Sequence, residues 1–116
     1  MHQTIYIRMK QAARQGRTLT YGDLAPLANL DMGNPGDRNK IAQILDEISS
    51  HEHAQGRPLL SALVVRGDAS GGGLPGGGFF KLSRRLGAQR AGQDDVAFFA
   101  AELTRVFDTW RGGDPA

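Results

Sequence analysis

The chain has 116 residues, with 16 glycines, no cysteine, and 14 Lys and Arg against 12 Asp and Glu. This length fits one small domain, predicted at residues 1–111 with a flexible tail at 112–116, and excludes a multidomain protein. The lack of cysteine excludes disulfides, thiol nucleophiles and cysteine-ligated metals. No apolar run reaches the roughly 20 residues of a membrane span, and the N-terminus lacks a signal-peptide core, so we expect a cytoplasmic location and no membrane partner.

Charge and glycine are both unevenly distributed along the chain. Residues 1–90 hold 12 Lys and Arg against 7 Asp and Glu, whereas residues 91–116 hold 2 against 5. The body is therefore basic and the C-terminal part acidic. Seven of the glycines lie between Gly67 and Gly78, so the glycine excess belongs to one segment.

The apolar spacing and the turn residues predict short, well-separated elements. In chain order we expect a helix at 2–15, a short strand at 17–20, a short helix at 21–28, a turn at 31–37, a long helix at 37–53, strands at 59–65 and 79–82 around a loop at 66–78, and a helix at 94–110. Gly16 is typical of a helix C-terminus. Thr20 and Asp23 form an imperfect capping box, and Pro26 should distort the second helix.

This order of elements is that of a winged helix. We expect the α+β class: a winged helix-turn-helix with three N-terminal helices, a small antiparallel sheet whose two strands are joined by the glycine-rich wing, and an added C-terminal helix.

The glycine segment also contains a formal G-x-G-x-x-G match at residues 71–76. A dinucleotide site needs this loop to open a helix, and here a strand is predicted to follow, so we expect a wing or a plain connector. His51 and His53 are two residues apart on a helix and point to different faces, which argues against a metal site. No catalytic constellation is recognisable, and we expect a protein that is not an enzyme and has no cofactor.

The start of the third helix carries polar and basic side chains that could contact base edges and phosphates. Asp46, Glu47 and Glu52 follow and would repel phosphate, so contact should be limited to the first two turns. Further cations lie near the predicted wing and could neutralise phosphates. This pattern predicts as DNA-binding residues Arg38, Asn39, Lys40, Gln43, Arg66, Lys81, Arg84 and Arg85. The same residues could instead form an ordinary solvated surface.

Residues 18–25, Thr-Leu-Thr-Tyr-Gly-Asp-Leu-Ala, resemble the start of the helix-turn-helix in alkylguanine-DNA alkyltransferases and alkyltransferase-like proteins. The resemblance covers residues 17–80, with Arg38 at the family's arginine finger. It implies a DNA-binding fold with Tyr21 at a phosphate and a helix in the minor groove. The family's Pro-Cys-His-Arg motif is absent, and Ser61 stands at the acceptor cysteine. A serine without an activating base cannot replace a thiolate, so we expect no alkyl transfer.

Two functions remain open at this point. The first is a non-enzymatic winged-helix protein that binds duplex DNA through the start of the third helix and the glycine-rich wing. The second is a module that binds a protein partner, or a second copy of itself, through the apolar C-terminal helix. Phe98 and Trp110 are the predicted interface residues of the second function.

Overall fold

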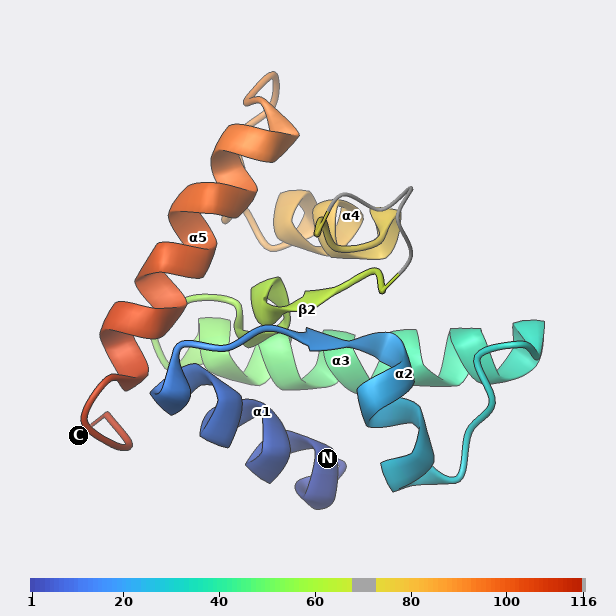
Figure 1. Cartoon of the computed structure of the whole chain (residues 1–116). Coiled ribbons are helices and arrows are strands. Elements are labelled where there is room, and N and C mark those ends of the chain that lie inside the picture. Colours follow the sequence, from blue (N-terminus) through green and yellow to red (C-terminus); the bar gives the residue numbers. More distant parts are fainter. Residues whose placement is uncertain (68–72, 116) are drawn as a thin grey trace.

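The computed structural model describes residues 1–67 and 73–115 of the chain. In these ranges, helices surround one very small sheet (Figure 1). The elements in chain order are α1 (Gln3–Gln15), β1 (Leu19–Thr20), α2 (Tyr21–Leu24), the 3-10 turn η1 (Ala25–Ala28), α3 (Pro35–Ala54), the 3-10 turn η2 (Leu60–Leu63), β2 (Val64–Val65), α4 (Gly77–Arg85) and α5 (Asp95–Trp110). The predicted α+β class is confirmed.

The first three helical segments begin and end where the sequence signals predict. Gly16 ends α1 in the left-handed conformation, with φ 68°. The capping box is complete: the Thr20 N–H donates to Asp23 Oδ2 at 2.9 Å, and the Asp23 N–H donates to Thr20 Oγ1 at 3.1 Å. Pro26 lies in η1, so the second helix continues only as a 3-10 turn. The Asn34 side chain caps α3.

The sheet differs from the predicted one. β1 and β2 pair in parallel, with Leu19 opposite Val64 and Thr20 opposite Val65. The predicted antiparallel pairing of residues 59–65 with 79–82 is wrong, because the partner of β2 comes from the N-terminal part of the chain. No winged-helix sheet is therefore present in the described residues.

The predicted strand at 79–82 is the helix α4. Phe79, Phe80, Leu82 and Ser83 are buried while Lys81 is exposed, which is the spacing of one helix face rather than of a strand. The segment 66–76 therefore connects a strand to a helix and does not join two strands as a wing would. Of the predicted wing, residues 68–72 lie outside the described residues.

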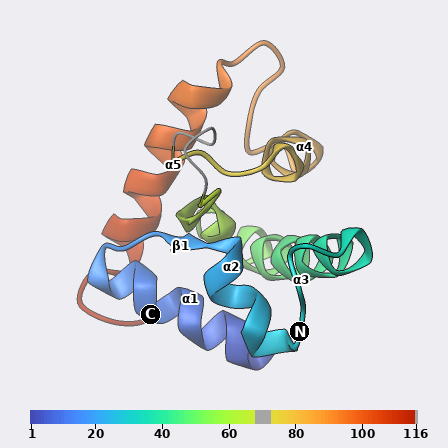
Figure 2. The ribbon, with the colours of Figure 1, turned by 45° about the vertical axis from the view of Figure 1, so that its right-hand side comes forward.

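The segment from Leu59 to Leu63 is the centre of the core. Leu59, Leu60 and Leu63 are fully buried, and η2 contacts α1, α3 and α5. The predicted strand at 59–65 is correct only for its last two residues, because η2 precedes β2. Figures 1 and 2 show η2 and β2 between α1 and α4, with α5 along one side. Complete burial explains the continuous apolar run, which does not distinguish a strand from a 3-10 turn.

The C-terminal helix α5 packs on α1 and η2. Phe99, Val106 and Trp110 are buried as its apolar stripe predicts, whereas Val96 is 55% exposed. After α5, Asp114 pairs with Arg14 of α1, so the described end of the tail lies against the body. No helix in the described ranges is long and apolar enough to cross a membrane.

A buried carboxylate fixes the C-terminal end of α3. Glu52 has no exposed surface and accepts a hydrogen bond from the Tyr6 hydroxyl at 2.8 Å. It also accepts two from Arg57, at 3.1 Å from Nε and 2.6 Å from Nη2. Arg57 in turn lies over the ring of Trp110, 5.8 Å from its centroid. Glu52 thus joins α1 and α3 to the chain that follows.

Candidate functional site

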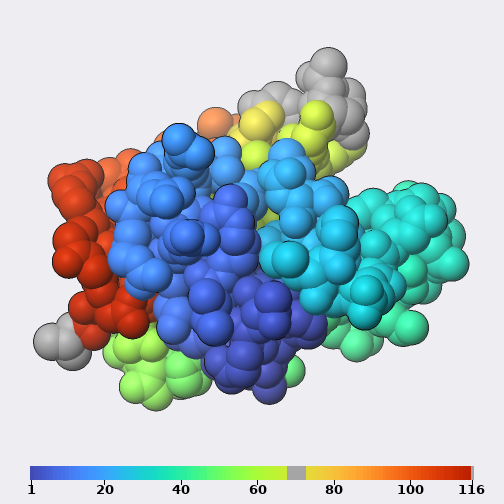
Figure 3. Space-filling view, turned by 60° about the horizontal axis from the view of Figure 1, so that its bottom comes forward, coloured from blue at the N-terminus to red at the C-terminus, as the bar shows by residue number. Residues whose placement is uncertain are grey.

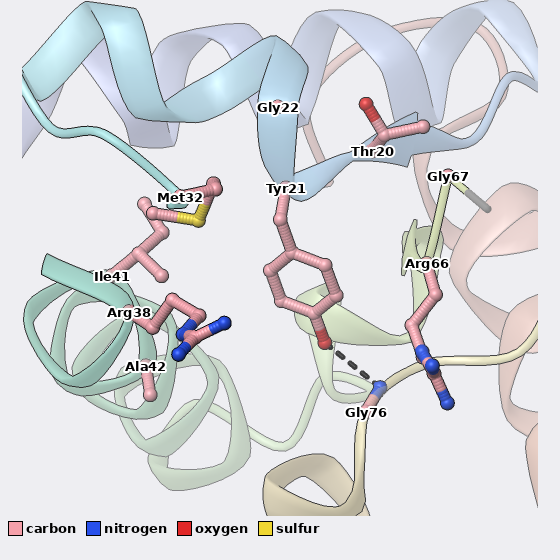
Figure 4. Close-up of a pocket in the computed structure, with 10 residues that line it drawn as sticks. All are labelled: Thr20, Tyr21, Gly22, Met32, Arg38, Ile41, Ala42, Arg66, Gly67 and Gly76. Atoms are coloured by element: carbon pink, nitrogen blue, oxygen red, sulfur yellow. Dashed lines mark hydrogen bonds between the residues drawn. The ribbon is translucent and has the colours of Figure 1, made fainter. Parts of the chain in front are cut away.

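An open pocket of about 490 Å³ lies between the start of α3, the start of α2 and the ends of the glycine segment (Figure 4). We call it the basic pocket, because its charged residues are two arginines. It is lined by Thr20, Tyr21, Gly22, Met32, Arg38, Ile41, Ala42, Arg66, Gly67 and Gly76.

Tyr21 holds one wall of the basic pocket. The capping box places it as the first residue of α2, and its hydroxyl accepts the Gly76 N–H at 2.9 Å (Figure 4). A Cβ at Gly76 would lie 3.1 Å from that hydroxyl, and a Cβ at Gly67 would lie 3.1 Å from Thr20 Cγ2. Glycine at 67 and 76 therefore lets both ends of the segment approach α2 and β1 closely.

Two guanidinium groups flank the Tyr21 ring. Arg38 comes from the first turns of α3 and Arg66 follows β2, and Figure 4 shows them on opposite sides of the ring. The Arg38 side chain is exposed and forms no ion pair within residues 1–67 and 73–115. Burial raises the pKa of the Tyr21 hydroxyl, partly offset by the Gly76 hydrogen bond and the charge of Arg66. The hydroxyl thus stays protonated at neutral pH and can donate to a ligand.

A smaller pocket of about 190 Å³ adjoins the basic pocket and shares Tyr21, Ala42 and Gly76 with it. Asp46 lines it, and burial raises the pKa of this carboxyl, against the opposing charge of Arg85. One carboxylate therefore lies beside the two arginines.

Ser61, which the resemblance aligns with the acceptor cysteine of the alkyltransferases, also lines the smaller pocket. Its Oγ accepts a hydrogen bond from Ser49 Oγ at 2.6 Å, and its N–H donates to Ser49 Oγ at 3.0 Å. Both serines are buried, and this pair joins α3 to η2. The partner of Ser61 is thus a second hydroxyl and not a base, which gives no means of activating it.

The remaining predicted DNA-binding residues of α3 do not join the basic pocket. Lys40 and Gln43 line a different hollow, which also contains His2 and Glu47, on another flank of the helix. The ammonium nitrogen Nζ of Lys40 lies 3.9 Å from Oδ1 of Asp37. Asn39 is exposed and lines neither hollow. Of the predicted set on α3, only Arg38 meets Tyr21 and Arg66.

The three cations of α4 differ in their surroundings. Arg84 pairs with Asp95 at the start of α5. Arg85 faces Asp46 of α3, and Lys81 precedes Arg85 by one helical turn. Arg85 thus lies near α3, on the α4 face that also carries Lys81, whereas Arg84 is used within the fold.

Phe98 and Trp110, the predicted interface residues, are buried in the chain's own core. They are 4% and 2% exposed, and the Phe98 ring stacks on Phe79 with centroids 6.0 Å apart. Neither side chain can offer the exposed apolar surface that the protein-interface hypothesis requires. The stripe on α5 is large because it closes the domain.

Neither a metal site nor a phosphate cradle finds support. No group of three His, Asp or Glu within the described ranges could hold a metal ion. The helix α4 follows the G-x-G-x-x-G match, so the strand that was predicted there and argued against a phosphate cradle is absent. Residues 71 and 72 of the match lie outside the described residues. However, Gly76, the last glycine of that match, donates its N–H to Tyr21.

Sequence reasoning missed Met32 and Gly76 as pocket residues, and it mentioned Asp46 only as a charge on the same helix. Asp46 lies eight residues after Arg38, with Ala42 between them, which is the spacing of one helix face. That spacing could have placed the carboxylate beside the pocket. The contacts of Met32 and Gly76 depend on chain segments far apart in sequence and left no signal.

Comparison with protein-family models, curated proteins and solved structures finds no significant match for this chain. The likeness of residues 17–80 to the alkyltransferases therefore remains a prediction.

Proposed function

We propose that the protein binds duplex DNA through the basic pocket and the exposed start of α3. The observation that carries this proposal is the meeting of Arg38 and Arg66, from distant parts of the chain, on either side of Tyr21 (Figure 4). Guanidinium groups bond phosphate oxygens in a bidentate manner and also read guanine edges. The Tyr21 hydroxyl adds a donor for a phosphate or sugar oxygen.

The shape of the surface suits this role. In Figure 3 the start of α3 protrudes at one end of the molecule, beside α2 and η1. A protruding helix start can enter a groove of DNA, whereas a recessed one cannot. Lys81 and Arg85, on α4, can then neutralise neighbouring phosphates.

The carboxylate of Asp46 limits the extent of contact along α3. It lies on the same flank as Arg38 but one pocket further along, where it repels phosphate. We therefore expect only a few phosphate contacts, from Arg38, Arg66, Lys81 and Arg85, and a modest affinity. Phe98 and Trp110, the residues predicted for the second function, are buried and do not support a protein interface on the apolar stripe of α5.

The experiment is a titration of a fluorescent random duplex of about 20 base pairs with the full chain, followed by anisotropy at about 50 and 200 mM salt. Two to four phosphate contacts predict a log–log slope of about −2 to −4, which is a loss of about 16- to 250-fold across this range. Micromolar or tighter binding at the lower salt supports the proposal. Absent binding, or binding that does not change with salt, contradicts it.

A further inference from the structure

A second hollow region lies toward the opposite end of α3 from the basic pocket. An open groove of about 630 Å³ lies between α5 and the loop that precedes it. It shares Ala88, Glu102 and Arg105 with a smaller pocket of about 170 Å³ that is also lined by His53. We call these two hollows together the α5 groove.

The α5 groove is separate from the proposed DNA surface. His53 follows Arg38 by 15 residues on α3, which corresponds to about 22 Å along the helix axis. Figures 1 and 2 show the start of α3 on the far side of the molecule from α5. A ligand in the α5 groove would therefore leave the basic pocket accessible.

The carboxylate of the groove is already neutralised within the chain. Glu102 is 2% exposed, and its Oε2 accepts the Leu59 N–H at 3.0 Å. Its Oε1 accepts a hydrogen bond from Arg105 at 2.7 Å through Nη1 alone, so the guanidinium retains further N–H donors. Glu102 thus orients Arg105 at the groove. Because the carboxylate is buried and both of its oxygens accept hydrogen bonds within the chain, it does not repel an anion in the groove.

Arg90, the arginine at the loop side of the groove, has no such partner among the described residues. The exposed Arg90 forms no ion pair with any residue in the described ranges. Its backbone N–H is held by the Gln93 side chain at 3.1 Å, which fixes the loop that carries it. Three guanidinium groups therefore line the groove, and Arg57, at its smaller end, is paired with Glu52. Glu102 is the one acid among the described lining residues, and it is buried and paired.

The rest of the lining combines the polar Gln93 with small and apolar side chains. Ala88, Ala101 and Phe98 belong to the groove, and Pro58 lines its smaller end. Ala101 is exposed, and its small side chain leaves room above the helix. A ligand that fits has a negative group for the guanidiniums and an apolar group for the alanine-lined floor.

We propose that the α5 groove binds a short peptide segment of a partner protein in which an acidic side chain stands next to an apolar one. The carboxylate bonds to Arg90 and to the remaining donors of Arg105, and the apolar side chain lies between Ala88 and Ala101. A volume of about 630 Å³ is in the range of sites that bury small ligands. The apolar side chains of Ala88 and Ala101 beside the arginines favour a peptide over the hydrated phosphate backbone of a nucleic acid.

The test uses the full chain labelled with ¹⁵N and two synthetic decapeptides. One alternates Asp or Glu with Leu or Phe, and the other has Lys in place of every acid. We expect the acidic peptide to shift the amide signals of Ala88, Gln93 and Ala101, with a dissociation constant of order 100 μM, and the lysine peptide to shift none of them. Arg90→Glu should weaken the acidic peptide at least tenfold. Arg17→Glu, the same charge change at an exposed arginine that does not line the groove, should leave it unchanged.

Ala101→Arg provides a second variant that does not alter the core, because it fills the groove from an exposed position. It should abolish the peptide shifts while circular dichroism stays that of the wild type. The proposal is overturned if the acidic peptide causes no shifts at the groove, if Arg90→Glu leaves its affinity unchanged, or if duplex DNA and not the peptide shifts these signals. Arg38→Glu should not affect peptide binding, so failure of the DNA proposal and failure of this one are distinguishable.

Discussion

The two ends of α3 use charge in opposite ways. At the C-terminal end, Glu52 is fully buried and its oxygens accept hydrogen bonds from Tyr6 and Arg57. At the N-terminal end, Arg38 is exposed at the basic pocket and forms no ion pair in the described part of the chain. Charges that are buried and paired hold the fold together, whereas an exposed arginine without an ion pair is available for a ligand. This contrast predicts that substitutions at one end change stability and substitutions at the other change binding.

The largest stability effect is expected at Glu52. Glu52→Ala removes the acceptor for Tyr6 and Arg57 and leaves a cation without its partner, which should cost about 3–5 kcal/mol of unfolding free energy. The matched control is Glu47→Ala on the same helix, because Glu47 is exposed and its one ion pair in the described ranges is with the N-terminal ammonium group, at 2.9 Å. That change should cost below about 1 kcal/mol. Urea denaturation measures the unfolding free energy of both variants. Equal losses in the two would contradict the proposed difference between the buried and the exposed carboxylate.

The hydrogen bond from Tyr6 to Glu52 makes the stability of the fold depend on pH. Burial, followed by the hydrogen bond to Glu52, raises the pKa of Tyr6 from 10.0 to about 12. The folded state holds the hydroxyl proton of Tyr6 more tightly than the unfolded state does. The contribution of Tyr6 to the free energy of unfolding is therefore complete below pH 10 and is lost as the pH rises toward 12.

Tyr6→Phe should therefore lower stability at neutral pH by about 1–3 kcal/mol. It should also reduce the loss of stability of the wild type between pH 10 and pH 12. Denaturation curves at both pH values measure this effect. An alkaline loss that is the same in the variant would show that Tyr6 does not carry it.

A smaller effect is expected at the wall of the basic pocket. Tyr21→Phe removes the acceptor of the Gly76 N–H and should cost about 0.5–1.5 kcal/mol. Hydrogen exchange of the Gly76 amide should become faster, because this bond ties the end of the glycine segment to α2. Unchanged protection at Gly76 would contradict the role given to the hydroxyl.

The smallest effect concerns Asp46 and rests on the proposed function. Asp46→Asn removes the negative charge beside the basic pocket and should increase duplex affinity about two- to fivefold at low salt, an effect that salt screens. Glu47→Gln neutralises a carboxylate one residue further on α3, at the other hollow, and should change the affinity less. Equal gains would mean that net charge alone, and not the position of Asp46, determines the affinity.

Local signals predicted the N-terminal half of the fold well, and long-range pairing explains the errors. Gly16, the Thr20 capping box and Pro26 each act within a few residues, so the sequence reveals them. The pairing of Leu19 with Val64 joins segments 45 residues apart, and nothing local specifies its direction. Phe79 to Leu82 is too short to distinguish a strand from a helix without knowing which side chains are buried.

The candidate site was predictable to a similar degree. Arg38 follows from the start of the third predicted helix and Arg66 from its place at the base of the predicted wing, whereas Tyr21 follows from the resemblance alone. Lys40 and Gln43 were included because they lie in the same two turns as Arg38, but the direction of each side chain depends on how α3 packs. The sequence predicts Phe98 and Trp110 as interface residues because the spacing of an apolar stripe does not distinguish a helix that covers the core from one that binds a partner.

The central claim is that DNA binding depends on the basic pocket rather than on positive charge anywhere along α3. Arg38→Glu and Lys40→Glu test it most directly, because they make the same charge change two residues apart, on different flanks of one helix. In the duplex anisotropy titration at low salt, Arg38→Glu should weaken binding at least about tenfold, and Lys40→Glu less than about threefold. Equal losses, or a larger loss for Lys40→Glu, would contradict the account.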